Sequence, residues 1–282
     1  MDDYFDLAGF APAALREYPH CAVYGLADHG GMQGLHAQLS RSSIAWRSLF
    51  EGSREENALA VAPLLFSLTD AWNGRHRPLL DWIAAHGTYT SSLLMLASPL
   101  AIDDVAARLA RRLDAALSED MNVMLRFFDP RVFEALTDVL DPAQREAFLG
   151  VADHWWYFDR RGALVAQPAR CDAQDGYAAP LRLTAAQEFA LLAASEPDQV
   201  AEQLQSMVPE PWRDVPLPRR IDFLQRHIGA ASALGLRSTR DLALYCAAAL
   251  VEGEEFAGTP KWRPLLAQVQ RGELDFGAAL AQ

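Results

Sequence analysis

The segment Met124–Arg131 constrains the fold most, because it encodes a strand and the start of a helix within a few residues. Its apolar side chains alternate as in a strand that is apolar on both faces, and Arg126 is the exception. Asp129 is a good helix N-cap, and Pro130 suits the first helical position because its φ is preset and it needs no hydrogen-bond acceptor. Arg126 needs an acidic partner or a position at a polar edge of the structure, since burying an unpaired charge costs several kcal/mol.

Further strands are predicted on both sides of this segment. The apolar runs at residues 21–26, 59–68 and 90–97 predict buried strands, and Pro63 within the second run indicates a strand start, an edge or a bulge. The aromatic run Trp155–Phe158 predicts a strand paired with residues 164–165 across a turn.

Helices are predicted between these strands. Apolar residues every four positions predict a helix from Val105 to Leu117, with Arg108, Arg111 and Arg112 on its outer side. Asp141 followed by Pro142 predicts a second capped helix start. The alternation of strands and helices predicts an α/β N-terminal lobe over residues 1–165, a mixed sheet with flanking helices.

The character of the chain changes after residue 165. Residues 166–182 are polar, small and turn-rich, which is typical of a linker. Residues 183–282 predict an all-α helical lobe of about four to six helices, with capping boxes beginning at Thr184 and Ser238. The prolines in this lobe predict an extended connection: Pro209, Pro211, Pro216 and Pro218.

Composition narrows the class of protein. The formal net charge is −12 and neither half of the chain is basic, so a nucleic-acid partner is not expected. The three cysteines are far apart and odd in number, as in a cytoplasmic protein with reduced thiols. We expect no signal peptide and no membrane insertion, because no apolar run reaches the ~18 residues that a spanning helix needs.

Candidate chemical sites are weak. The glycines between Gly25 and Gly34 do not have the spacing of a nucleotide-binding loop, and the seven histidines do not pair at metal-ligand spacing. Asp153 and His154 are neighbours on a predicted strand and therefore point to opposite faces. We expect no cofactor, no metal and no catalytic residue, and a binding protein is favoured over an enzyme.

Two groups of residues could bind a partner or a ligand. Arg126, Asp129 and Arg131 could grip a phosphate or carboxylate, although an internal ion-pair network with a helix cap is the simpler interpretation. Trp155 and Trp156 could anchor a protein partner, since aromatic residues dominate interface hot spots, and core packing is an equal alternative.

Several stretches resemble one bacterial family, the effector adaptor chaperones of type VI secretion systems, first described as a domain of unknown function. The matching stretches, in chain order, are Tyr24–Asp28, Ser48–Ser53, Ala60–Leu65, Leu125–Arg131 and Leu149–Ala152 before Trp155-Trp156. The sequence departs from the family pattern at Gly25, where a larger residue is usual, and at Tyr89–Ser92.

The resemblance implies a non-enzymatic, cytoplasmic adaptor. Such a protein binds a secreted toxic effector, through the effector's N-terminal region, and helps load it onto the VgrG-type spike protein. Motif residues expected at the partner-binding surface are Phe50, Glu51, Arg126, Phe127, Asp129, Arg131, Trp155 and Trp156, and Glu51 is the candidate ion-pair partner of Arg126. The alternatives are an enzyme that binds a small ligand through the Arg/Asp cluster, or an immunity-type protein that occludes the toxin.

Overall fold

The computed structural model describes residues 5–74, 76–87, 91–119 and 121–282. The chain divides into two compact units, Met1–Leu191 and Leu192–Gln282. The N-terminal unit is α/β and the C-terminal unit is helical, as the sequence predicts. Within the described residues, no helix combines the length and the apolar character needed to cross a membrane.

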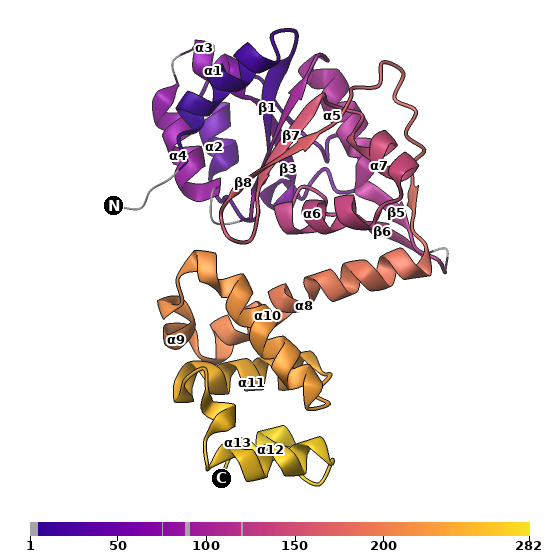
Figure 1. The fold of residues 1–282 in the computed structure, drawn as a ribbon. Helices are drawn as coiled ribbons and strands as arrows, with labels where there is room; N and C mark the ends of the chain where they lie inside the picture. The colour runs from indigo at the N-terminus through magenta and orange to yellow at the C-terminus, as the bar shows by residue number, and fades with distance from the viewer. Residues whose placement is uncertain (1–4, 75, 88–90, 120) are drawn as a thin grey trace. The chain divides into compact units, whose positions relative to one another are not determined.

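A six-stranded sheet forms the centre of the N-terminal unit (Figure 1). Every strand in it runs antiparallel to its neighbours. In spatial order the strands are β2 (Trp46–Ser48), β3 (Pro63–Ser67), β1 (Ala22–Asp28), β4 (Leu93–Ser98), β7 (His154–Phe158) and β8 (Leu164–Pro168). The predicted buried strands are confirmed, and Pro63 stands at the start of its strand, where proline does not interrupt a ladder. Residues 88–90, which include the start of the strand predicted at 90–97, lie outside the described residues.

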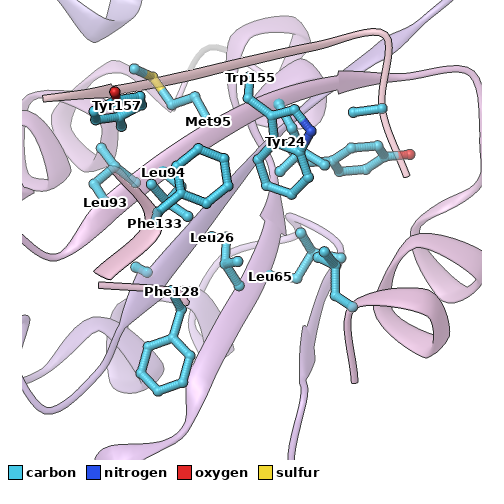
Figure 2. Close-up of a cluster of buried hydrophobic side chains, with 14 of the residues drawn as sticks. Tyr24, Leu26, Leu65, Leu93, Leu94, Met95, Phe128, Phe133, Trp155 and Tyr157 are labelled. Atoms are coloured by element: carbon cyan, nitrogen blue, oxygen red, sulfur yellow. The ribbon is translucent and has the colours of Figure 1, made fainter. Parts of the chain in front are cut away.

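Helices cover both faces of this sheet (Figure 1). One side carries α1 (Leu7–Glu17), α2 (Leu35–Ser40), α3 (Leu68–Asn73) and α4 (Arg77–Gly87). The other carries α5 (Ile102–Ala110), α6 (Pro130–Val139) and α7 (Pro142–Leu149). Because both faces are covered, nearly every residue of the central strands is buried, as Leu26, Leu65 and Met95 show (Figure 2).

The aromatic strand β7 packs on both sides of the sheet. The Trp155 ring lies 5.1 Å from the Phe133 ring of α6, and the Trp156 ring lies 5.1 Å from the Phe10 ring of α1. This follows from the alternation of side chains along a strand. The predicted pairing with residues 164–165 is confirmed, since Tyr157 lies opposite Val165 and Phe158 opposite Leu164.

The segment around Met124 corrects one prediction. The strand β6 covers only Asn122–Met124, and it pairs with β5 (Asp114–Ala116) and through it with β9 (Leu181–Arg182) in a second, smaller sheet. This small sheet has one antiparallel and one parallel pair, so the predicted mixed pairing occurs here and not in the helix-flanked sheet, which is antiparallel throughout. The strand does not continue to Phe128, because a turn after Leu125 buries the adjacent Phe127 and Phe128 together.

A second correction concerns Arg112. The helix α5 ends at Ala110 and a 3-10 turn follows, so Leu117 is not helical and Arg112 points inward with no exposed surface. Its guanidinium donates to the carbonyls of Phe148 at 2.8 Å and Ala147 at 2.9 Å, and to Asp175 at 2.7 Å. Burial lowers the pKa of Arg112, and the hydrogen bond and charge of Asp175 oppose that shift. A periodic apolar pattern could not show that the helix stops early.

Residues 166–182 are more than a linker. They contribute the strands β8 and β9, and Tyr177 is 3% exposed within the core of the N-terminal unit. Two further arginines hold this segment: Arg108 donates to the Asp172 and Ala173 carbonyls, and Arg111 donates to Asp175 and the Tyr177 carbonyl. The division between the compact units falls later, at Leu191/Leu192 within helix α8.

The helices of the C-terminal part enclose a core of their own. They are α8 (Ala185–Met207), α9 (Pro209–Asp214), α10 (Leu217–Ala233), α11 (Thr239–Glu252), α12 (Trp262–Gln270) and α13 (Phe276–Leu280). The capping predictions are confirmed, because the side chains of Thr184 and Ser238 accept from the N–H groups of Gln187 and Asp241. The predicted extended connection is wrong: Pro209 begins helix α9, since proline suits a first helical turn as well as an extended chain.

Candidate functional site

The C-terminal end of strand β1 holds an ion pair at the protein surface. Asp28, the last residue of β1, accepts from Arg126 at 2.7 Å and from the Gly30 N–H at 2.9 Å. The side chain of Arg126 is 57% exposed and lies over the Phe128 ring, 5.5 Å from its centroid. The predicted pairing of Arg126 with Glu51 is therefore wrong. Arg126 keeps its charge at the surface and finds a carboxylate that the β1 turn already positions.

An open pocket of about 430 Å³ is linked to the end of β1 through a contact of His29 with Leu59. It is lined by Trp46, Arg47, Ser48, Glu51, Glu56 and Leu59. His29, the residue after Asp28, connects the two features, because its ring nitrogen lies 2.7 Å from the Leu59 carbonyl oxygen. Glu51 thus belongs to this surface even though it does not pair with Arg126.

Apolar side chains that solvent can reach accompany these charges. Val61 is 53% exposed and packs beside Gly30, where an added Cβ would lie 3.6 Å from it. The Trp46 ring is half-buried and meets the His36 ring edge-on at 5.1 Å. We call the pocket residues together with His29, Val61 and Arg126 the β1-end surface. It combines accessible apolar side chains with charged groups, a mixture that also occurs in protein-binding patches.

Asp129 and Arg131 form a local unit. Asp129 caps helix α6 by accepting from the Arg131 N–H at 2.9 Å, and the Arg131 guanidinium donates to both carboxylate oxygens at 3.0 and 2.6 Å. The cap predicted at Asp129 and the proline start at Pro130 are confirmed. Arg126 and Arg131 therefore each pair with a carboxylate of their own, Asp28 and Asp129.

The aromatic residues expected at the partner-binding surface are buried. Phe50 is 2% exposed, Phe127 and Trp155 are fully buried, and Trp156 is 6% exposed. They belong to the core and cannot themselves make the main contacts. Accessible residues that the sequence interpretation missed are Trp46, Leu59 and Val61. The apolar run that contains the last two predicts a strand, and only the structure shows that Leu59–Val61 is a 3-10 turn with its side chains partly outside.

A separate group of possible metal ligands lies at the opposite end of β1. His20, Cys21 and Asp153 bring a ring nitrogen, a thiol and a carboxylate within 4.8 Å of one another. Asp153 is more than a hundred residues away from the other two, so no spacing rule could have found this group. Asp153 lies just before β7, and His154, the first residue of the strand, contacts a different partner, the Tyr18 hydroxyl, at 2.7 Å.

Comparison with known families places most of these features in one domain. Residues 23–147 match the family model described as "Domain of unknown function (DUF4123)". This match covers 125 of the 282 residues. No curated protein and no solved structure matches the chain. The DUF4123 domain begins in β1 and ends in α7, so it includes the whole β1-end surface, whereas the strand β7 and the C-terminal helices follow it.

Proposed function

We propose that this protein is a non-enzymatic adaptor of a type VI secretion system. It binds a toxic effector in the cytoplasm of the producing cell, keeps it soluble and helps deliver it to the spike protein. The DUF4123 domain over residues 23–147 supports this proposal, because the sequence stretches that resemble the adaptor family fall mainly within it.

The observation that carries the proposal is the β1-end surface. Its arginines are paired with carboxylates and its apolar side chains, such as Val61, remain accessible. Catalysis on a small ligand calls for a deep pocket in which polar groups converge, whereas this surface is shallow and open. An open surface with accessible apolar side chains beside charged groups suits a segment of a protein partner. In this proposal the N-terminal region of the effector binds there.

Co-expression with a candidate toxic effector tests the proposal. We expect a stable complex on size exclusion and more soluble toxin than without the adaptor. Val61→Asp should weaken the complex at least ~tenfold, because a charge buried in an interface is costly to desolvate. Val251→Asp is the matched control, since Val251 is also exposed, at 65%, but lies in the C-terminal unit.

Two outcomes would contradict the proposal. One is a toxin that does not co-elute with this protein. The other is a toxin that is equally soluble with and without it. An immunity function would show a different pattern, because it requires that the protein rescue cells from the mature toxin domain alone.

A further inference from the structure

His20, Cys21 and Asp153 lie where helix α1, strand β1 and strand β7 come together. His20 and Cys21 fill the short connection between α1 and β1, and Asp153 comes just before β7. Asp153 Oδ2 lies 2.7 Å from His20 Nε2 and 3.5 Å from Cys21 Sγ. The ring nitrogen and the thiol therefore converge on one carboxylate oxygen.

This donor set fits one class of ligand. An imidazole, a thiolate and a carboxylate together are typical ligands of Zn²⁺ and related transition metals, whereas Ca²⁺ and Mg²⁺ prefer oxygen alone. Bonds of about 2.0–2.3 Å in a tetrahedral site place neighbouring ligand atoms about 3–4 Å apart. The Cys21 to Asp153 distance of 3.5 Å already satisfies this. The 2.7 Å distance between His20 Nε2 and Asp153 Oδ2 must lengthen slightly to admit the cation. The His20 side chain is 63% exposed and can move.

A hydrogen bond from a neighbouring residue orients the Asp153 carboxylate, as such bonds orient the ligands in known metal sites. Asp153 Oδ1 accepts from the Cys171 N–H at 2.8 Å, which leaves Oδ2 directed at His20 and Cys21. Burial tends to raise the pKa of Asp153, but the hydrogen bonds from Cys171, His20 and Cys21 outweigh it and the pKa is lowered. Burial, with a further contribution from Asp153, raises the pKa of Cys21 to about 12.

We propose that His20, Cys21 and Asp153 bind a zinc-type divalent cation, with water as the remaining ligand. On binding, the Cys21 thiol loses its proton to solvent and a metal–sulfur bond forms. The cation would join the start of β1 to the start of β7, which are 132 residues apart between Cys21 and Asp153. This role is structural and independent of the β1-end surface and of the proposed adaptor function.

Cobalt titration of the full-length protein tests the site. Co²⁺ replaces Zn²⁺ in such sites, and a cysteine ligand adds a sulfur-to-cobalt charge-transfer band in the near ultraviolet. We expect this band to saturate at one Co²⁺ per chain and to disappear when Zn²⁺ is added. Zn²⁺ should also raise the thermal midpoint, because a ligand that binds only the folded state stabilises it.

Matched variants decide the outcome. Cys21→Ser should abolish the charge-transfer band, whereas Cys171→Ser, which keeps the backbone N–H that orients Asp153, should retain it. His20→Ala should weaken Co²⁺ binding at least ~tenfold. The proposal is overturned if the wild-type protein shows no band or if the band survives in Cys21→Ser. If Cys21→Ser does not fold, His20→Ala decides alone, and an unchanged Co²⁺ affinity overturns the proposal.

Discussion

At the scale of single residues, Asp28 and Asp129 accept the same pattern of hydrogen bonds. Each carboxylate accepts a backbone N–H two residues ahead, from Gly30 or Arg131, and each also holds an arginine side chain. The turn fixes the carboxylate, and the carboxylate fixes the guanidinium. The arginines are thus placed by local backbone geometry, which favours a structural role over the capture of a free anion.

Asp129 should contribute to stability and little to partner binding. Asp129→Ala removes the cap of α6 and the partner of Arg131, and should lower the free energy of unfolding by about 1 kcal/mol, within a range of about 0.5–2. Asp129→Asn keeps a side-chain oxygen that can cap the helix, so it should lower the free energy of unfolding by less. Urea denaturation measures both, and co-elution with the effector measures binding. An Asp129→Ala protein with unchanged stability but no effector binding would show that the structural interpretation is wrong.

His227 should make the C-terminal unit sensitive to acid. The ring is 3% exposed and packs against the rings of Phe223 and Tyr245. Burial lowers the pKa of His227, Glu254 and Glu255 oppose the shift, and Arg226 adds to it. The folded state therefore prefers the neutral ring. Its contribution to stability is complete above the unfolded pKa of about 6.5 and is lost as the pH falls through the lower folded value.

Comparison with His227→Leu isolates this contribution. We expect the free energy of unfolding of the wild-type protein to fall from about pH 7.5 to about pH 5, and the fall to be smaller in His227→Leu. His86→Leu, at an exposed position on α4, is the control and should follow the wild-type protein. If the free energy of unfolding falls equally with pH in the wild-type protein and in His227→Leu, the prediction is wrong.

At the scale of elements, the pairing of β1 with β3 explains the unusual Gly25. Gly25 lies opposite Phe66, and a Cβ at Gly25 would come within 2.4 Å of the Phe66 ring. The ring fills the space that a larger residue at position 25 would occupy. The departure from the family pattern at Gly25 is thus compensated across the strand pair.

The Gly25–Phe66 pair should be energetically coupled. Gly25→Ala forces the ring to move and should cost about 1–3 kcal/mol. In a Phe66→Leu background the same change should cost less, because the smaller side chain leaves room for the methyl group. A double-mutant cycle measured by urea denaturation gives the coupling. Strict additivity of the two substitutions would contradict this account.

Elements that depend on local signals could be predicted from the sequence, and those that depend on tertiary contacts could not. The starts of α6, α7 and α11 follow from a capping residue, with a proline after it in the first two. The end of α5 does not, because Arg112 turns inward to meet the carbonyls of Phe148 and Ala147, which are distant in sequence.

The same distinction holds for the candidate site. The local cap between Asp129 and Arg131 could be derived from the sequence, since its partners are two residues apart. The partner of Arg126 could not, because Asp28 is 98 residues away and the sequence offers many carboxylates. The convergence of His20 and Cys21 on Asp153 could not be predicted for the same reason.

At the scale of the whole molecule, the chain has two hydrophobic cores. One cluster lies in the α/β unit and the other in the helical unit, and no residue belongs to both among the described residues. Each cluster is large enough to support a cooperative unit, since a domain requires a core of its own. The order of an α/β lobe and a helical lobe follows from the change of periodicity in the sequence, whereas the point of division within α8 follows from contacts alone.

Two cores predict two unfolding transitions in calorimetry, because cooperativity extends only as far as continuous packing. A substitution in one core should then shift one transition. Arg112→Met leaves Asp175 buried beside fewer partners and should lower the stability of the α/β unit by about 3–5 kcal/mol. Trp262→Ala removes a side chain that is 1% exposed and should lower the stability of the helical unit by about 3–5 kcal/mol.

The two variants serve as controls for each other. Arg112→Met should leave the transition that Trp262→Ala lowers unchanged, and the reverse should also hold. Arg108→Met provides a milder comparison at the same 172–177 segment, because Arg108 is only half-buried and donates to the Asp172 and Ala173 carbonyls, which carry no charge. A single transition that both Arg112→Met and Trp262→Ala lower would instead mean that the two cores unfold as one cooperative unit.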